Sequence, residues 1–555
     1  MFRTILLFIY ISALLDAKVL GLDSLLTKYN QESERYKQTK KDAGGEFIVF
    51  TREDLSRMHV RELNDILYLL KTFNLSRSRV GDHQLGLSST PSSVTTPIKI
   101  FINHHELSSE SFGNVVIRYG DMNLDFIDYI EVYQAGNSVS FGNESGTVIV
   151  RLFTKDPSRE NGSFAKMELD DKGSSALNIL SAYNLEDKKS SYLISANLKR
   201  KNGESYYNNN YELKNDFTKA NLFFQYNKKD DYSVEFNAVK GIKDSFANDS
   251  LSPTYGIMQG NILFLHLDKQ LPQNFALRLC ATYEKINIDN TDAVGIKLSN
   301  GTLPKNVHID LHTLNTKVIL EKEMQLENNF LFFGAQLQRV KFVIDDFRAD
   351  GVVQTGMFGE KRNLFSIYGE NTYHYNNDTL FVAGLKYNRY SDNNSVSQAD
   401  GDLIFRVGNV SYLGKLKNKF FVFNRVIRPS MMQESFSPIK VKANPNLKSA
   451  ETFIYSEDLT YQVQKNSSLH VGIAVAKFKN SIGTSPVLHQ YINNPNTLHL
   501  KRPYVGFEHK FDLENKIKFE VYKVFLENTH FSPNSGGVLQ LFNKIGKLDI
   551  LGFTS

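Results

Sequence analysis

After residue 157 the chain alternates between apolar and polar residues over most of its length. The clearest apolar sets are Tyr192, Ile194, Ala196 and Leu198, then Val234, Phe236 and Ala238, then Leu277, Leu279, Ala281 and Tyr283. Polar side chains alternate with these apolar ones: Ser195, Asn197 and Lys199, then Ser233, Glu235 and Asn237, then Arg278, Thr282 and Glu284. A period of two residues predicts strands with one apolar and one polar face. Such strands suit a wall with lipid on one side and water on the other.

Polar turns divide these strands and alternate with longer connections. The short turns stand at Asp187-Lys188, Lys229-Asp230, Asn328-Asn329, Asn376-Asn377, Lys417-Asn418, Lys465-Asn466 and Glu514-Asn515. Connections such as 201–218 and 427–450 are longer. Short turns on one rim and long loops on the other are typical of an outer-membrane barrel, and the pattern predicts about 18 strands with a nineteenth beginning near Lys547. The alternative is a soluble protein of many hairpins such as a propeller, but no fixed repeat marks its blades.

The first part of the chain has a different pattern. Phe47–Phe50 is a short apolar strand, and Thr51 follows as a helix N-cap with two carboxylates in the first turn. The pattern predicts one amphipathic helix over 52–71, with its apolar side at Leu55, Leu63, Ile66, Leu67 and Leu70. Further strands are predicted at 98–102, 129–133 and 148–152. Together these elements form an α/β module of about 110 residues, large enough for its own core.

The N-terminal residues resemble a leader rather than a folded element. Residues 1–17 combine Arg3, an apolar core from Ile5 to Leu15 and a small residue at Ala17, which indicates a secretory signal peptide. Residues 18–45 are polar, with a narrow helical stripe that ends at Gly44-Gly45. We therefore expect export and a mature chain that begins near Lys18.

Composition excludes several classes of protein. No stretch after the leader approaches the roughly 18 apolar residues of a transmembrane helix, so a membrane would be crossed by strands. The net charge is +5 and the pI about 8.7, which is too weak a bias to indicate nucleic-acid binding. The one cysteine, Cys280, cannot form an intramolecular disulfide.

Candidate chemistry is sparse. No set of side chains indicates catalysis, because the paired carboxylates at loop ends are of the kind that water usually solvates. We predict no enzyme activity, no cofactor and no metal site. His104-His105-Glu106 is the only cluster with metal-ligand character. Adjacent histidines on an extended segment point to opposite faces, so they do not readily share one ion.

Five short stretches resemble, in order and spacing, the plug domain of TonB-dependent outer-membrane receptors. They are residues 49–55, 62–67, 127–132, 141–142 and 149–155. The chain departs from the family pattern in three places. Asn103-His104 replaces the Asp-Gly that usually follows the middle strand, the Arg-Gly-rich segment near residues 78–90 is poorly kept, and Gly136-Asn137 stands where Gly-Pro is usual.

The resemblance implies a fold that is mainly β: a transmembrane antiparallel β-barrel with an N-terminal α/β plug. The plug would cover residues 46–157 and the barrel 158–555. Barrels of this family have 22 strands, against about 18 or 19 recognised here, so we expect the barrel to be C-terminally incomplete, as in a fragment or truncated product. No TonB-box pentapeptide stands between the leader and the plug.

The implied function is a receptor in the cell outer membrane of a Gram-negative-type bacterium. It would take up a scarce nutrient, such as a metal chelate or siderophore, a corrinoid or an oligosaccharide. Its partners would be outer-membrane lipid, a small-molecule ligand and a TonB-type energy-coupling protein. A barrel-anchored adhesin or outer-membrane enzyme with a passive plug is the alternative. Longer loops would favour the adhesin, and a catalytic set near strand ends would favour the enzyme.

The resemblance also assigns candidate site residues. His104, His105 and Glu106 follow the middle plug strand and would lie at the extracellular apex, where ligand is met. Thr51, Glu131, Gly142, Arg151 and Lys155 would have structural roles in the plug. Glu131 and Arg151 are expected to form ion pairs with the barrel wall.

Overall fold

The computed structural model describes residues 47–554, apart from connecting stretches of which the longest are 88–97, 140–147, 246–253, 393–400 and 528–534. The predicted signal peptide and the segment 18–45 lie outside the described residues, as does Gly142. Within the described residues, no helix is both long enough and apolar enough to cross a bilayer.

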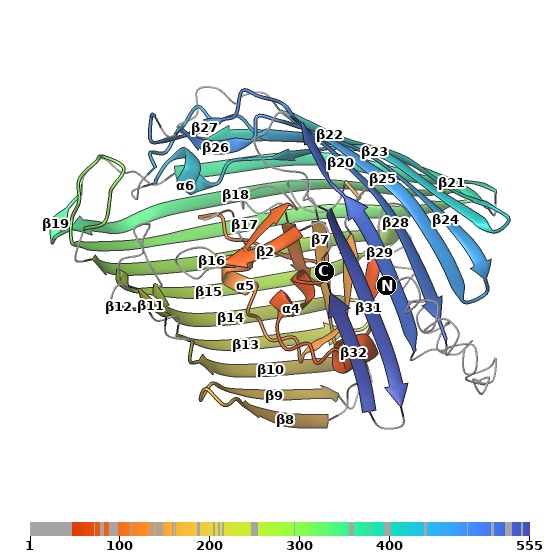
Figure 1. The fold of residues 1–555 in the computed structure, drawn as a ribbon, viewed down its shortest axis with the longest axis horizontal. Coiled ribbons are helices and arrows are strands. Elements are labelled where there is room, and N and C mark those ends of the chain that lie inside the picture. Colours follow the sequence, from red (N-terminus) through yellow and green to blue (C-terminus); the bar gives the residue numbers. More distant parts are fainter. Residues whose placement is uncertain are drawn as a thin grey trace.

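A large antiparallel sheet makes up most of the molecule (Figure 1). Its strands follow chain order and the sheet closes, with β32 next to β8. They are β8 (Gly162–Leu169), β9 (Ser175–Asn184), β10 (Ser190–Lys201), β13 (Phe217–Lys228), β14 (Tyr232–Ser245), β15 (Thr254–Leu271), β16 (Phe275–Asp292), β17 (Asn306–Leu326), β18 (Asn329–Ala349), β20 (Glu360–Asn376), β21 (Thr379–Asp392), β22 (Asp402–Leu413), β23 (Leu416–Ile427), β24 (Ala450–Gln464), β25 (Ser467–Lys479), β28 (Leu498–Lys510), β29 (Lys516–Lys523), β31 (Ser535–Ile545) and β32 (Leu548–Thr554).

Two further segments of this sheet, β19 (Val352–Val353) and β30 (Phe525–Glu527), only extend the hairpins beside them. The described residues therefore form 19 spans, as the sequence predicted. The alternating faces are also confirmed. Leu198 on β10 is 58% exposed on the outside, whereas Glu235 and Asn237 on β14 are 2% and 0% exposed.

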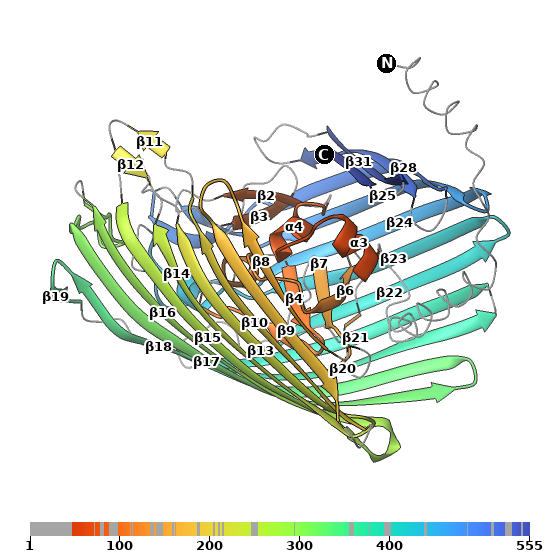
Figure 2. The same ribbon diagram turned by 90° about the horizontal axis from the view of Figure 1, so that it is seen from below.

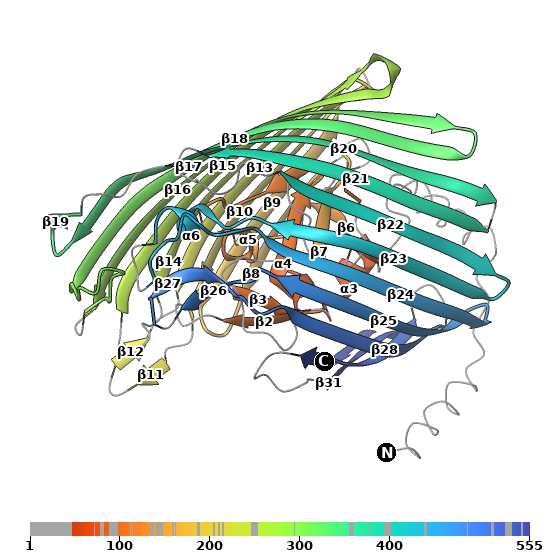
Figure 3. The same ribbon diagram turned by 90° about the horizontal axis from the view of Figure 1, so that it is seen from above.

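The two rims of the barrel differ. One rim carries the hairpins β11 (Tyr206–Asn208) with β12 (Tyr211–Leu213) and β26 (Ile482–Ser485) with β27 (Gln490–Asn493), together with helix α6 (Met431–Glu434) (Figure 3). The other rim has short turns, including the 3-10 turn Pro272–Asn274. One predicted turn is misplaced: Lys417 and Asn418 lie within β23, and the turn falls three residues earlier, where Gly414 adopts a φ of 60° that glycine allows at little cost.

The N-terminal unit, residues 47–154, is an α/β plug inside the barrel (Figure 2). Its five-stranded sheet has the order β1-β6-β7-β4-β5, and only β4 and β7 are parallel. The strands are β1 (Phe47–Phe50), β4 (Ile98–Ile102), β5 (His105–Leu107), β6 (Ile127–Tyr133) and β7 (Val148–Thr154). The hairpin β2 (Phe73–Arg77) with β3 (His83–Leu87) and the helix α5 (Val115–Tyr119) complete it.

The predicted helix over 52–71 is wrong as a single element. The structure has two short helices, α3 (Arg52–Arg57) and α4 (Leu63–Leu67). His59 adopts a left-handed φ of 50° between them, and Glu62 with Asp65 starts the second helix through a new capping box. The apolar side was predicted correctly, since Leu55, Leu63, Ile66, Leu67 and Leu70 are all buried.

The plug core continues into the barrel wall. Ile130, Val132 and Leu152 of the plug belong to the same buried cluster as Leu193, Phe223 and Phe264 of the barrel. Phe126 of the plug packs against Phe223 with ring centroids 4.8 Å apart. The plug is therefore docked by apolar packing on this side. A smaller apolar cluster joins Val139 of the plug to Phe332 and Tyr368 of the wall, and polar contacts complete the interface.

Candidate functional site: the interface between plug and barrel

Glu284 on β16 is the centre of the polar contact between plug and wall. Its carboxylate accepts hydrogen bonds from the hydroxyls of Ser109 (3.1 Å) and Ser111 (2.7 Å) and from Nε of Arg118 (2.9 Å). The side chains of Glu284 and Arg118 are 2% and 7% exposed. A charge buried this deeply is tolerated only when it is paired and hydrogen-bonded. One barrel carboxylate thus holds the plug segment 109–118.

Glu106 on β5 makes the reverse arrangement, with the acid on the plug. Nζ of Lys317 on β17 lies 2.6 Å from its carboxylate, and Nζ of Lys99 on β4 lies 3.1 Å away. Burial alone would raise the pKa of Glu106, but the two ammonium groups outweigh it and the pKa is lowered. Glu106 is therefore a carboxylate that joins two plug strands to the wall.

Beyond Glu106 the interface encloses a small polar cavity of about 40 Å³. Its lining includes Lys99, Glu106, Glu110, Arg362 and Tyr390. Burial raises the pKa of Glu110, against the opposing effect of Lys317. The side chain of Glu110 accepts a hydrogen bond from Asn315 (2.9 Å), and its carbonyl accepts one from the backbone of Met431 in α6 (3.4 Å). A segment of the long-loop rim therefore reaches down to the plug.

The turn between β4 and β5 makes a further polar contact between the plug sheet and the wall. Asn103 has a left-handed φ of 49°, which asparagine adopts more readily than most residues. Its side-chain amide donates to Glu235 (2.6 Å) and to Thr154 (3.1 Å), and its carbonyl oxygen accepts from the backbone of Thr154. Asparagine thus serves here in place of the Asp-Gly that the family usually has.

His104 follows in the same turn and reaches Asp268 on β15, with Nδ1 3.0 Å from the carboxylate. Burial, and next the charge of Arg278, lower the pKa of His104 to about 4, so the ring is neutral near pH 7. Asp268 also accepts from Nε of Arg278 (2.9 Å), and Arg278 pairs with Glu321. The turn is thereby connected to a chain of charges along the wall.

These contacts correct the expected position of the turn. Asp268 lies near the end of β15 beside the short turn Pro272–Asn274, and Glu235 lies near the start of β14 on the same rim. The turn with His104 therefore lies toward the short-turn rim and not at an apex under the long loops. The reason is topological: β4 runs parallel to β7, so both strands end at the same side of the plug. A ligand-binding role for His104, His105 and Glu106 stays a prediction.

The sequence comparison decides the family. Residues 162–497 match the profile described as "TonB dependent receptor-like, beta-barrel". The chain belongs to this family. The matched residues belong to the barrel. The N-terminal unit, residues 47–154, lies inside the barrel where the plug of such a receptor is expected. No curated protein sequence matches the chain.

Solved receptor structures share this fold. The siderophore receptor PirA from Acinetobacter baumannii is 12% identical with a TM-score of 0.64, and the match covers 92% of this chain and 93% of that one. The copper transporter OprC is 12% identical with a TM-score of 0.69, covering 90% and 84%. The ferric yersiniabactin uptake receptor FyuA from Yersinia pestis is 11% identical with a TM-score of 0.64, covering 92% and 85%. At these identities the likeness is one of fold.

The receptor's predicted structural residues take up clear positions. Thr51 caps α3 in a capping box with Asp54, as predicted. Glu131 and Arg151 face each other on β6 and β7, 3.6 Å apart, because the strand register aligns the two residues. Ion pairs of these residues with the wall stay a prediction. Nζ of Lys155 lies 5.1 Å from the ring centre of Phe164 on β8. Burial, and next the charge of Arg52, lower the pKa of Lys155.

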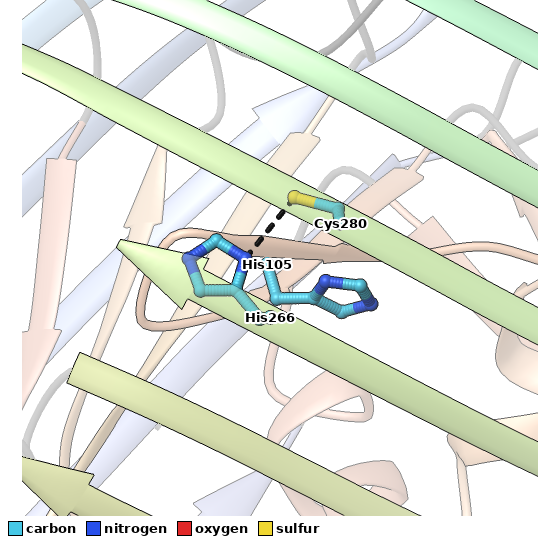
Figure 4. Close-up of side chains that lie close together, drawn as sticks. All are labelled: His105, His266 and Cys280. Atoms are coloured by element: carbon cyan, nitrogen blue, oxygen red, sulfur yellow. Dashed lines mark hydrogen bonds between the residues drawn. The ribbon is translucent and has the colours of Figure 1, made fainter. Parts of the chain in front are cut away.

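Sequence reasoning missed one cluster at the interface. His105 on β5 lies beside His266 on β15 and Cys280 on β16 (Figure 4). The alternation of β16 puts Cys280 on the same face as Arg278 and Thr282, but the partners of Cys280 depend on strand register and on plug docking. His266 is the residue directly opposite Cys280 in the hairpin. The register could have been inferred from the intervening turn, whereas the approach of His105 could not.

Proposed function

We propose that this receptor takes up a metal chelate of the siderophore class across the outer membrane, gated by its plug and driven by a TonB-type partner. The observation that carries the proposal is the plug itself, docked in the lumen by buried polar contacts to several wall strands. The solved structures that share the fold support the ligand class, since they include a siderophore receptor, a ferric enterobactin receptor and a copper transporter.

The polar character of the interface suits a gate that must open. Separating an apolar interface exposes surface to water at roughly 25 cal/mol per Å². Groups such as Glu284 and Lys317 instead exchange protein partners for water when the plug moves, so the net free energy of each exchange is smaller. Apolar packing on the Phe223 side would then act as the hinge about which the polar side separates.

The two ends of the plug fit the two tasks of such a receptor. At the long-loop rim, α6 and the segment around Glu110 are in contact, so a ligand held by the loops would be sensed by the plug. At the short-turn rim, α3 is tied to β29 through Asp54 and Lys516 (3.1 Å). β1 is the first strand of the plug along the chain. It lies at the edge of the plug sheet, next to β6. Tension on the residues before Phe47 would act on β1 first.

An uptake assay tests this proposal. The full-length chain is expressed in a Gram-negative host that lacks its own siderophore receptors, in strains with and without TonB. We expect the chain in the outer-membrane fraction and accumulation of at least one labelled ferric siderophore only where TonB is present. Labelled cobalamin and a maltooligosaccharide serve as the other ligand classes. Uptake of either one alone would refute the ligand class, and equal uptake without TonB would refute the coupling.

A further inference from the structure

Three metal-ligating side chains from three strands meet at the interface between plug and wall. His105 comes from β5 of the plug, and His266 and Cys280 come from β15 and β16 of the wall. Each offers one ligand atom, and these atoms lie within 4.8 Å of one another. Nδ1 of His266 is 3.1 Å from Sγ of Cys280, and Figure 4 shows the His266 ring directed at the sulfur with His105 alongside.

The cluster is sealed from water and its hydrogen bonds are incomplete. His105, His266 and Cys280 are 2%, 1% and 8% exposed. Nδ1 of His105 and Nε2 of His266 are buried without a hydrogen-bond partner. Leaving such a buried group without a partner is unfavourable, so two of them within one cluster of three residues require an explanation. A cation bound to Nδ1 of His105 satisfies that nitrogen in place of a hydrogen bond, and a cation bound through Nε2 of His266 satisfies the other.

The neighbours of His105 prepare it as a ligand. Its Nε2 lies 3.2 Å from Oγ1 of Thr282, which leaves Nδ1 as the free ring nitrogen. Metal-bound histidines typically donate the other ring N–H to an oxygen that fixes the tautomer and the ring orientation. The ring also stacks on Phe264 with centroids 4.1 Å apart, which holds it in place and excludes water.

We propose that His105, His266 and Cys280 form a binding site for one thiophilic cation, Cu(I) or Zn(II), that joins the plug to the barrel wall. A thiolate and two imidazoles are ligands that these cations prefer, whereas Ca²⁺ and Mg²⁺ require oxygen. Binding replaces the thiol proton of Cys280, so one proton is released to solvent for each cation bound. No electron transfer is involved.

The position of the site gives it a consequence for gating. One ligand belongs to the plug and two belong to the wall, so an occupied site ties β5 to β15 and β16. Moving this part of the plug away from the wall then requires breaking a metal–imidazole bond as well as the polar contacts. Cation occupancy would therefore hold the plug closed, whichever nutrient the receptor carries.

Metal titration of the purified full-length protein tests the site. The protein carries an affinity tag without histidines, and its thiol is kept reduced. Cu(I) is titrated against a chromophoric Cu(I) chelator, Zn²⁺ is titrated separately, and Co²⁺ serves as a probe for thiolate-to-metal charge transfer. We expect one tightly bound cation in the wild type. Cys280→Ser and His266→Gln should weaken binding by more than about 100-fold, because loss of a mere outer-shell partner already costs 10–100-fold.

His312→Gln is the matched control. His312 on β17 pairs with Asp345 on β18, and among the described residues it belongs to no cluster of this kind. It should bind like the wild type. Circular dichroism and heat-modifiable gel mobility establish that each variant is folded.

Hydrogen exchange gives a second measurement. The cation should slow hydrogen exchange in β4 and β5 of the wild type and of His312→Gln. It should leave the exchange rates of Cys280→Ser unchanged. Equal binding by the wild type and Cys280→Ser, or Co²⁺ binding without thiolate charge transfer, would overturn the proposal. Tight binding of only one of the two cations, lost in Cys280→Ser, would support it and identify the metal.

Discussion

At the scale of single residues, the receptor is characterised by buried charges that cross from plug to wall. Arg118 reaches Glu284, Glu106 reaches Lys317, and Glu370 on β20 accepts from Arg406 (3.1 Å) and from the backbone of Val139 (3.3 Å). Displacement of the plug breaks several of these contacts at once. The interface therefore specifies one docked position.

Glu284→Gln should weaken plug docking by about 3–5 kcal/mol, the range found when one partner of a buried ion pair is removed. The amide keeps the size of the side chain but removes the negative charge that the guanidinium of Arg118 pairs with. The measurement is hydrogen exchange of the backbone amides in α5 at increasing urea concentration. The urea concentration at which half of the protection is lost is the midpoint that is compared.

Glu527→Gln is the control for this variant, because its partner Lys501 is 51% exposed and exposed pairs contribute at most about 1 kcal/mol. Equal midpoints for the two variants would mean that Glu284 does not hold the plug.

Asp121 gives the interface a pH dependence. Burial would raise its pKa, but the ammonium of Lys219 outweighs this and lowers it. A lowered pKa in the folded state means that the contribution to stability is complete above the ordinary pKa near 4 and is lost as the pH falls through the folded value. The urea midpoint for α5 should therefore fall between pH 6 and pH 3.

Asp121→Asn should remove the part of this fall that Asp121 causes, so the variant's midpoint changes less over the same pH range. A fall of the same size in Asp121→Asn and the wild type would assign the effect to other carboxylates.

At the scale of elements, short helices and hairpins of the plug depend on local hydrogen bonds. α3 has only six residues, and an isolated helix of this length is unstable in water. It is held by its cap at Thr51, by packing of Leu55, and by the tie from Asp54 to Lys516 on β29.

Thr51→Ala should destabilise the plug by about 1 kcal/mol, because the variant loses the side-chain acceptor for the backbone N–H of Asp54. Thr51→Ser keeps the acceptor and should behave like the wild type. Hydrogen exchange of α3 measures both. If serine and alanine are equally destabilising, the methyl group of Thr51 matters and the cap does not.

The elements also show how far the sequence predicts this structure. Strand alternation is a local signal, so the barrel, its inward faces and its 19 described spans were predicted from it. The cap at Thr51 and the apolar side of α4 are local in the same sense. The break at His59, in contrast, depends on a left-handed φ of 50°, which the spacing of the apolar residues does not reveal.

The candidate site could be predicted only in part, because its contacts join residues far apart in sequence. His104-His105-Glu106 was singled out as a cluster, and each member does contact the wall. Their partners Asp268, Thr282 and Lys317 are fixed by how the plug docks and not by any spacing along the chain. The direction of the turn was mistaken because it follows from the parallel pairing of β4 with β7, which single strands do not reveal.

At the scale of the whole molecule, two units with different stabilising forces share one lumen (Figure 2). The barrel satisfies its backbone hydrogen bonds between neighbouring strands, as a wall in lipid requires. The plug has its own sheet and its own helices, and it contacts the wall through side chains. The wall is therefore expected to persist when the plug is removed, and the plug is the part that closes the lumen.

Deleting residues 47–155 should convert a closed receptor into a conducting one. A barrel of this size encloses a lumen wide enough for small solutes unless something fills it, and here the plug fills it. In planar lipid bilayers the intact protein should show little conductance, and the deletion should give stable openings many times larger. Urea should open the intact protein reversibly, and Glu284→Gln should open at a lower urea concentration than the wild type. Equal conductance of the intact and deleted forms would mean that the plug does not occlude the lumen, and gating by the plug would then be refuted.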